Sequence, residues 1–322
     1  MDFEKFSDEH VALNSKFKDE IAEALGYYIQ PSYLFSNICK YIEEINENFL
    51  PIYIIKLFKN IEDSGKKYSY QMKGIFSDFD INNIKLGNTA YARKQVIVDL
   101  FKSINGLDFL NSGNIDILGS AYEYIMKLYV ANSGKSSGEY FTPPSLSSLL
   151  MKLAINNKTS TRSVYDPTAG SGGLLLKSIE ILGIDNVEHI YGQEVDSTTY
   201  NLCKMNMIMH RMDYNRFNIA HDDTLTHPAF LKKKPFETIV ANYPFSVTWK
   251  GEDDPRLVSD KRFNCVEVLP PKQRADYAFI LHALNYLADN GTAAIICYPG
   301  ILYRGEEELA IRKYLIENRY ID

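Results

Sequence analysis

The stretch Val164-Tyr165-Asp166-Pro167-Thr168-Ala169-Gly170-Ser171-Gly172-Gly173 decides the expected fold of this chain. An apolar strand ends at the carboxylate of Asp166, a turn of small residues follows, and a helix begins near Leu174. Glycines allow a sharp turn and the close approach of a ligand, and the N-terminus of the helix presents free N–H groups to it. Because ligands bind at the carboxyl edge of open α/β sheets, the stretch predicts a nucleotide-type binding turn. A glycine-rich turn without a ligand is the alternative.

Strands and helices are expected to alternate after this turn. The expected strands are 189–194, 217–220, 236–241 and 292–297, and the expected helices are 197–210, 276–288 and 306–318. Strands separated by helices imply a parallel sheet with helices on both faces. The predicted fold class is therefore α/β, with a Rossmann-like doubly wound sheet.

Helical spacing dominates the residues before the turn. Apolar faces are expected at Ile52, Ile55 and Phe58, at Val96, Leu100 and Ile104, and at Leu146, Leu149, Leu150 and Leu153. The polar, glycine-rich segment 132–138 is typical of a linker. We therefore predict a helical N-terminal domain over 1–131 and a second domain over 138–322. The helical domain is either a scaffold or a surface that docks on a partner or on DNA.

Composition narrows the class of protein. The 322 residues carry a formal net charge of -6, so DNA binding requires local basic patches or a partner. The four cysteines are scattered, which indicates reduced thiols and neither a disulfide framework nor a metal site. The sequence begins without a signal-peptide pattern and has no apolar run of about 18 residues. These features predict a cytoplasmic protein with no membrane span and no metal.

Polar side chains follow four of the expected strands. They are Asp166, Glu194, Asp223 and Asn242. Because the carboxyl ends of parallel strands meet at one edge of a doubly wound sheet, we expect these groups to converge. Glu194 is placed to accept hydrogen bonds from both hydroxyls of a ribose. Asp223 is placed to accept a hydrogen bond from an exocyclic amine. Each acid is also compatible with a helix N-cap or a solvated loop end.

The most informative of these strand ends is Asn242-Tyr243-Pro244-Phe245. The Asn242 side chain offers a carbonyl oxygen to an amino group, and Pro244 stiffens the turn. The backbone carbonyl of Tyr243 then lies beside that oxygen, and Phe245 provides a flat face for stacking. Two acceptors and one ring suit a planar amine such as adenine. A β-turn with a core phenylalanine is the competing interpretation.

Two further segments flank these strands. In Glu139-Tyr140-Phe141-Thr142-Pro143-Pro144, Thr142 is expected to be a helix N-cap, with prolines in the first turn. The two aromatics favour a hydrophobic staple over a wall for a flat ligand. The charged segment 249–274 is expected to be a mobile loop that contacts phosphates, or equally a solvated loop without that role.

These motifs, in this order, resemble S-adenosylmethionine-dependent adenine-N6 DNA methyltransferases. The resemblance rests on Asp166–Gly173, Glu194, Asp223 and Asn242–Phe245, with Gly138–Pro143 ahead of the glycine turn. The segment Leu118-Gly119-Ser120-Ala121-Tyr122-Glu123-Tyr124 and the helical N-terminal region narrow it further. Together they resemble the modification (M) subunit of type I restriction-modification systems, over nearly the whole chain.

The resemblance implies a cofactor, a reaction and partners. S-adenosylmethionine would be bound by Glu139, Tyr140, Phe141, Thr142, Pro143, Pro144, Asp166, Gly170, Ser171, Gly172, Gly173, Glu194 and Asp223. A flipped adenine would be held by Asn242, Tyr243, Pro244 and Phe245, and methylated directly, without a metal or covalent enzyme intermediate. The implied partners are DNA, a specificity (S) subunit and a restriction (R) subunit, with contacts between two copies of the chain left open.

Two departures from the family pattern leave alternatives open. Tyr243 replaces the first proline of an Asn-Pro-Pro-Phe motif, so a less rigid loop is expected. The chain is also expected to be cut at both ends, without a C-terminal helical region that helps bind the S subunit. The alternatives are a non-catalytic interaction subunit that keeps the cofactor fold, and an N-methyltransferase acting on RNA or on a protein amide.

Overall fold

The computed structural model of the chain describes residues 18, 20–22, 27–64, 69–107, 117–132 and 142–321. The chain divides into two compact units, Met1–Ala121 and Tyr122–Asp322. The division falls inside helix α7 (Ile117–Asn132), just ahead of the segment predicted to be a linker.

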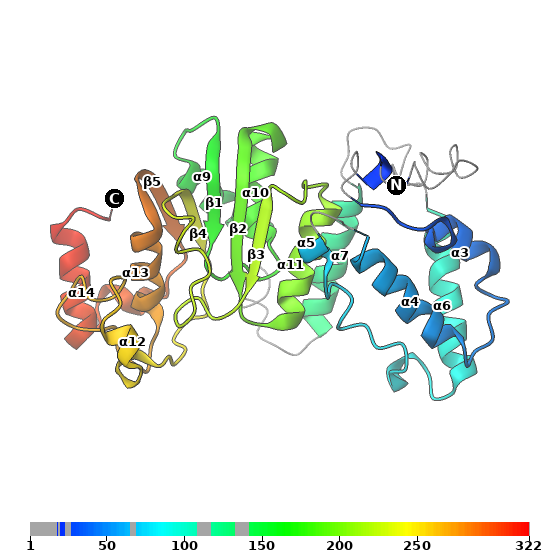
Figure 1. The fold of residues 1–322 in the computed structure, drawn as a ribbon. Coiled ribbons are helices and arrows are strands. Elements are labelled where there is room, and N and C mark those ends of the chain that lie inside the picture. The colour runs from blue at the N-terminus through cyan, green and yellow to red at the C-terminus, as the bar shows by residue number, and fades with distance from the viewer. Residues whose placement is uncertain are drawn as a thin grey trace. The chain divides into compact units, whose positions relative to one another are not determined.

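The described part of the first unit is helical (Figure 1). Its elements are η1 (Pro31–Tyr33), α3 (Phe35–Tyr41), α4 (Leu50–Glu62), α5 (Ser69–Met72), η2 (Ile84–Leu86) and α6 (Ala90–Asn105). Helix α6 begins where the Thr89 hydroxyl accepts a hydrogen bond from the Ala92 amide, 3.1 Å away. The core of this unit comprises Ile38, Ile42, Leu50, Ile54, Leu57, Ile81, Ile97 and Val98.

The helical spacing predicted at 52–58 and 96–104 is confirmed by α4 and α6, but most of the residues that define it do not face the core. Ile52 and Ile55 are exposed, whereas Leu50, Ile54 and Leu57 are buried. Both sets follow helical spacing, because α4 is apolar on more than one side, and spacing alone does not decide which stripe packs. In α6, Val96 and Leu100 are likewise exposed.

The second unit contains a parallel sheet, which confirms the predicted fold class. Its strands in the described residues are β1 (Thr161–Asp166), β2 (Val187–Glu194), β3 (Phe217–His221), β4 (Phe236–Ala241) and β5 (Leu287–Ile295). They lie in the order β3-β2-β1-β4-β5, and every neighbouring pair is parallel. The order reverses between β1 and β4, so the carboxyl ends of these two strands border the topological switch point where such sheets bind ligands.

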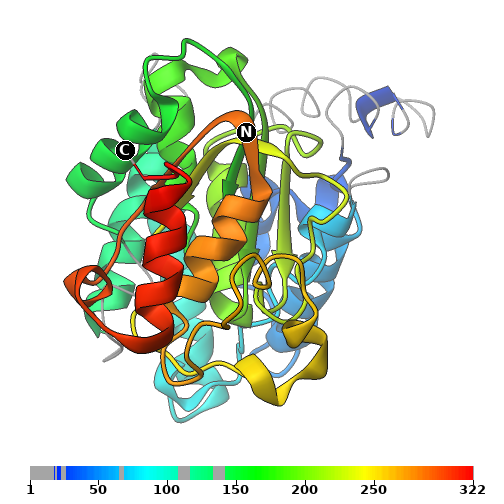
Figure 2. The same cartoon turned by 90° about the vertical axis from the view of Figure 1, so that its left-hand side faces the viewer.

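Helices cover both faces of this sheet. One face packs against α9 (Pro144–Ile155), α10 (Gly173–Leu182) and α11 (Ser197–Met209). The other packs against α13 (Asp276–Tyr286), which lies beside α14 (Glu306–Glu317) in Figure 2. Strand alternation explains this arrangement, since Val164 faces the first layer and its neighbour Tyr165 the second.

Two details of this unit differ from the predictions. On α9, Leu150, Met151 and Ala154 are buried, whereas Leu149 and Leu153 are exposed. Helix α13 ends at Tyr286, and β5 begins at once with Leu287, opposite Phe236. The register of β4 and β5 then shifts, and regular pairing resumes where Thr238 lies opposite Thr292. The strand predicted from the sequence begins at this residue, Thr292.

The remaining short elements are η3 (Ile184–Asn186), η4 (Gly251–Asp253), α12 (Pro255–Val258) and η5 (Pro299–Leu302). None of the helices in the described ranges is long and apolar enough to cross a membrane. Over the same ranges, His, Cys, Asp and Glu side chains form no cluster that could hold a metal ion.

Candidate active site

The glycine turn connects β1 to α10. Gly170 and Gly172 adopt positive φ values of 54° and 79°, which favour glycine. A Cβ atom at Gly172 would lie 2.6 Å from the Met207 Cε atom and 2.8 Å from the Cys203 Sγ atom. Two constraints therefore require glycine at position 172, namely its backbone conformation and the packing of α11 against the turn.

Two carboxylates hold the turn in place. The Asp166 carboxylate accepts a hydrogen bond from the Thr168 amide at 2.8 Å. The Glu194 carboxylate, at the end of β2, accepts from the Gly170 amide and the Asp196 amide, each at 2.9 Å. Each carboxylate oxygen has a second lone pair, so Glu194 keeps acceptor capacity for a ligand.

Burial changes the acidity of both groups. Asp166 is only 1% exposed, and this burial, with the nearby Glu194 charge, raises its pKa to about 7. Burial also raises the pKa of Glu194. Desolvation makes the ionised form of both carboxyl groups costly, Asp166 being buried and Glu194 half-buried, and a positively charged ligand nearby would favour that form.

We expect Asp166→Asn to stabilise the folded chain at pH 8. Because the folded-state pKa of Asp166 is about 7, its contribution to stability is fully present below the unfolded-state pKa near about 4 and is lost as the pH rises through about 7. Asparagine does not ionise, so the gain in unfolding free energy should reach about 2–4 kcal/mol at pH 8 and vanish near pH 4.

Urea unfolding of the wild type and the variant across this pH range measures the effect. Asp185→Asn, at an exposed position, is the matched control and should change the unfolding free energy by less than about 0.5 kcal/mol. A pH-independent difference between wild type and Asp166→Asn would contradict the assigned ionisation.

The end of β3 joins this turn. The Asp223 carboxylate accepts from the Leu225 amide at 2.9 Å and from the Thr226 hydroxyl at 2.7 Å. The Thr224 hydroxyl donates to the carbonyl oxygen of Pro167 at 2.5 Å. The β3 loop and the glycine turn therefore form one continuous wall.

The loop after β4 carries Asn242. Its side-chain amide donates to the Thr142 hydroxyl at 3.1 Å. Pro143 occupies the N-cap position of α9, so the prediction that Thr142 is that N-cap is wrong. The Thr142 hydroxyl contacts Asn242 instead, because the Asn242 loop lies beside the start of the helix. The predicted positions Glu139, Tyr140 and Phe141 lie outside the described residues.

The aromatic residues of this loop diverge. The Tyr243 side chain is buried and stacks on Phe279 of α13, with ring centroids 5.2 Å apart and planes at 12°. Phe245 is 41% exposed and meets the edge of Tyr243, with centroids 5.5 Å apart. The Tyr243 ring thus fills the core behind the loop, and the Phe245 ring faces outward.

A cavity of about 180 Å³ lies at this edge of the sheet. The structure brings Glu194, Asp223, Asn242 and Pro244 together in its lining. Two more predicted residues are hydrogen-bonded to residues of the lining. The Asp166 carboxylate accepts from the Thr168 amide, and the Gly170 amide donates to Glu194. Ser171, Gly172, Gly173, Pro143, Pro144, Tyr243 and Phe245 do not line it.

Sequence reasoning did not assign eight residues of the lining to the site. They are Pro167, Thr168, Gln193, Val195, Asp196, Asp222, Thr224 and Phe279. Seven of them lie within two positions of a predicted strand-end residue in the sequence, which was the available signal. Phe279 had no such signal, because it lies on a helix that forms after the chain has left the sheet edge.

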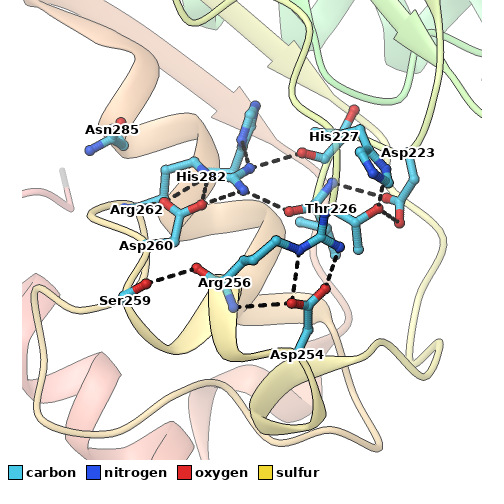
Figure 3. A network of polar contacts seen from close by, with 12 residues as sticks. Asp223, Thr226, His227, Asp254, Arg256, Ser259, Asp260, Arg262, His282 and Asn285 are labelled. Atoms are coloured by element: carbon cyan, nitrogen blue, oxygen red, sulfur yellow. Dashed lines mark hydrogen bonds and ion pairs between the residues drawn. The ribbon is translucent and has the colours of Figure 1, made fainter.

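The charged segment 249–274 packs apolar side chains against this wall, so the interpretation as a wholly solvated loop is wrong, whereas its mobility and its contacts with phosphates stay a prediction. Trp249, Leu257 and Phe263 are buried. Arg262 is 2% exposed and donates to the carbonyl oxygens of Thr224 and Leu225 at 2.8 and 2.6 Å (Figure 3). Its guanidinium group anchors the segment to the loop that supplies Asp223.

The remaining donors of Arg262 are also satisfied. They pair with the Asp260 carboxylate at 2.7 Å and with the His282 Nδ1 atom at 2.9 Å. Burial and the Arg262 charge hold the pKa of His282 well below its usual value, so this imidazole is neutral. Because Arg262 only donates, Nδ1 is the acceptor, and His282 Nε2 carries the proton beside the Tyr165 hydroxyl, 2.9 Å away.

The site lies within a segment that matches a known protein family. Residues 113–322 match the N-6 DNA Methylase family model. The chain is 41% identical to the type I restriction enzyme MpnII methylase subunit of Mycoplasma pneumoniae, over 99% of this chain and 62% of that protein. It is 31% identical to the type I restriction enzyme HindI methylase subunit of Haemophilus influenzae, over 82% of this chain and 59% of that protein.

The fold is also similar to a solved structure. The crystal structure of the type I restriction-modification system methyltransferase subunit from Streptococcus thermophilus matches with a TM-score of 0.86 and 29% identity. The match covers 99% of this chain and 66% of that one. The chain therefore spans about three fifths of the length of the two related methylase subunits.

Proposed function

Because the chain belongs to the N-6 DNA methylase family, we propose that it transfers a methyl group from S-adenosylmethionine to N6 of adenine in DNA. It acts as the modification subunit of a type I restriction-modification system. The observation that carries this proposal is the cavity at the switch point of the sheet, which gathers Glu194, Asp223 and Asn242 from the ends of three strands.

The residues present fit the cofactor. S-adenosylmethionine carries a sulfonium, an ammonium group and a ribose diol. The carboxyl groups of the buried Asp166 and the half-buried Glu194, whose pKa values desolvation raises, suit a polar, positively charged ligand. Asp166 and the turn 170–173 would hold the methionine moiety, and Glu194 the ribose. Asp223 would accept from the adenine amine, and residues 139–144 would also bind the cofactor.

The Asn242 loop fits the target base. An adenine must leave the duplex stack before it reaches such a site. The exposed Phe245 ring would stack on it, while the Asn242 side chain and the Tyr243 carbonyl would accept from its amine. When bound, the cofactor supplies a methyl group whose bond to sulfur breaks as the N6 lone pair forms the new bond, and N6 then loses a proton to solvent.

The proposal extends to organisation and partners. A helical domain over 1–131 precedes a methyltransferase domain over 138–322, and the protein acts in the cytoplasm on DNA. Relatives named methylase subunits of type I restriction enzymes support a specificity subunit and a restriction subunit as partners. Pairing of two copies of the chain belongs to the same proposal, and light scattering on the assembled complex measures it.

Calorimetry with S-adenosylmethionine, followed by transfer of a tritiated methyl group to DNA with and without the specificity subunit, tests this function. Cofactor binding and adenine methylation are the expected results. Binding without turnover in the presence of the specificity subunit would favour a non-catalytic interaction subunit. Transfer to RNA or to a glutamine side chain, with none to DNA, would favour the other class of N-methyltransferase.

A further inference from the structure

The first turn of α13 holds the Asn242 loop at three successive places. The Phe279 ring stacks on the Tyr243 ring. The Asp276 carboxylate accepts a hydrogen bond from the Ser246 amide at 3.2 Å. The Ala275 amide donates to the Val247 carbonyl oxygen at 2.8 Å. These contacts cover both flanks of Phe245.

The contact at Ser246 is the unusual one. Ser246 has a φ of 54°, a left-handed conformation that residues with a side chain rarely adopt. Its side chain is exposed, so packing of that side chain does not impose the conformation. The carboxylate acts on the backbone instead, by fixing the direction of the Ser246 amide.

Asp276 is suited to this task because it is itself immobilised. It is fully buried, and within the described part of the chain its Oδ1 atom has no hydrogen-bond partner, so the contact with the Ser246 amide is made by Oδ2. The Arg304 guanidinium lies 3.9 Å from Oδ2 and also pairs with the buried Glu308 at 3.3 Å. Arg274 approaches the same Glu308 oxygen at 3.4 Å. The Ser246 amide is therefore bound to one oxygen of a cluster of charged side chains around the buried Asp276 and Glu308.

We propose that Asp276 is a positioning residue for methyl transfer, which sets the Asn242–Phe245 loop through the Ser246 amide. This inference rests on the proposed function, in which that loop holds the target adenine. The Asn242 oxygen and the Tyr243 carbonyl grip one amine only if the turn between them keeps its shape. Displacements of about 1 Å in such a site are enough to lower a rate about 100-fold.

Three variants separate this role from general stabilisation. Asp276→Ala removes the acceptor. Asp276→Asn keeps an oxygen for the Ser246 amide but removes the charge. Glu308→Gln is the matched control, because it removes a carboxylate charge from the same buried cluster without touching the loop. Hydrogen–deuterium exchange of the peptide 242–248 reports loop order without DNA or cofactor.

The expected pattern is selective. Exchange at 242–248 should be at least about tenfold faster in Asp276→Ala, and within about threefold of wild type in Asp276→Asn and Glu308→Gln. With the specificity subunit and unmethylated genomic DNA as substrate, kcat should fall about 10- to 100-fold in Asp276→Ala alone. The dissociation constant for S-adenosylmethionine should stay within about twofold of wild type in all three.

Several results would overturn the inference. One is equal loop exchange in Asp276→Ala and wild type, and another is equal acceleration by Glu308→Gln. Loss of kcat in Asp276→Asn to the level of Asp276→Ala would assign the effect to charge instead of the hydrogen bond. If Asp276→Ala does not fold, hydrogen–deuterium exchange of the wild type tests the inference by itself. An unprotected Ser246 amide would contradict its hydrogen bond to Asp276. A wild-type chain that binds no cofactor would refute the proposed function. The exchange data would still test whether Asp276 orders the loop, because they need no cofactor.

Discussion

Asn242→Ala is expected to lower kcat for adenine methylation about 10²- to 10³-fold, while the dissociation constant for S-adenosylmethionine changes less than about twofold. The Asn242 side chain lines the cavity and is already oriented, because its amide nitrogen donates to the Thr142 hydroxyl. That hydrogen bond directs the amide nitrogen toward Thr142, so the carbonyl oxygen lies on the other side of the same amide group. Alanine removes this acceptor without disturbing the Glu194 side of the site, so the loss should appear in kcat.

Single-turnover transfer of a tritiated methyl group and calorimetry separate the two quantities. Asn186→Ala is the matched control, since Asn186 lies at the opposite, amino edge of the sheet and its side chain donates to the Leu182 carbonyl oxygen. It should leave kcat unchanged. Full methylation by Asn242→Ala would reject the role of Asn242, and a parallel loss of cofactor affinity would move Asn242 to the cofactor side of the cavity.

The sheet was predictable because its signals are local. Four of the strands are short, mainly apolar runs that end in a polar residue or are followed by one, and a glycine turn or an acid marks the carboxyl edge. The helix faces were less predictable, since α4 carries two stripes with the same spacing and only tertiary packing chooses between Ile54 and Ile55. The same limit applies to β5, whose first residues pair across a break in register that no sequence period reveals.

The candidate site likewise contains residues that could be predicted from the sequence and residues that could not. Glu194, Asp223 and Asn242 could be predicted because strand ends converge by topology alone. Phe279 and the Arg262 network could not, because they reach the cavity wall from a helix and a loop far along the chain. Charge composition does not separate the basic residues of the segment 249–274: Arg262 is buried and bound to internal partners, whereas Lys250, Arg256, Lys261 and Lys272 are exposed.

The largest effect on stability is expected from Arg262→Met, which should lower the free energy of unfolding by about 3–5 kcal/mol. Methionine fills a similar volume but donates no hydrogen bond. The substitution leaves the carbonyl oxygens of Thr224 and Leu225 and the His282 Nδ1 atom without this donor. The Asp260 carboxylate loses the guanidinium group but keeps the hydrogen bond from the backbone amide of residue 262, at 2.8 Å. Each buried acceptor left unpaired costs about 1–3 kcal/mol, partly relieved where water enters.

Arg256→Met is the matched control for this variant, because both arginines lie in the segment 249–274 and both pair with an aspartate (Figure 3). The Arg256 side chain is 64% exposed, against 2% for Arg262. An exposed ion pair contributes only about 0–1 kcal/mol, so urea unfolding followed by circular dichroism should separate the two variants clearly. Equal losses would mean that the segment packs through its apolar residues alone. A selective loss in Arg262→Met, with weaker cofactor binding at temperatures where the variant is folded, would tie the cavity wall at Asp223 and Thr224 to this one guanidinium group.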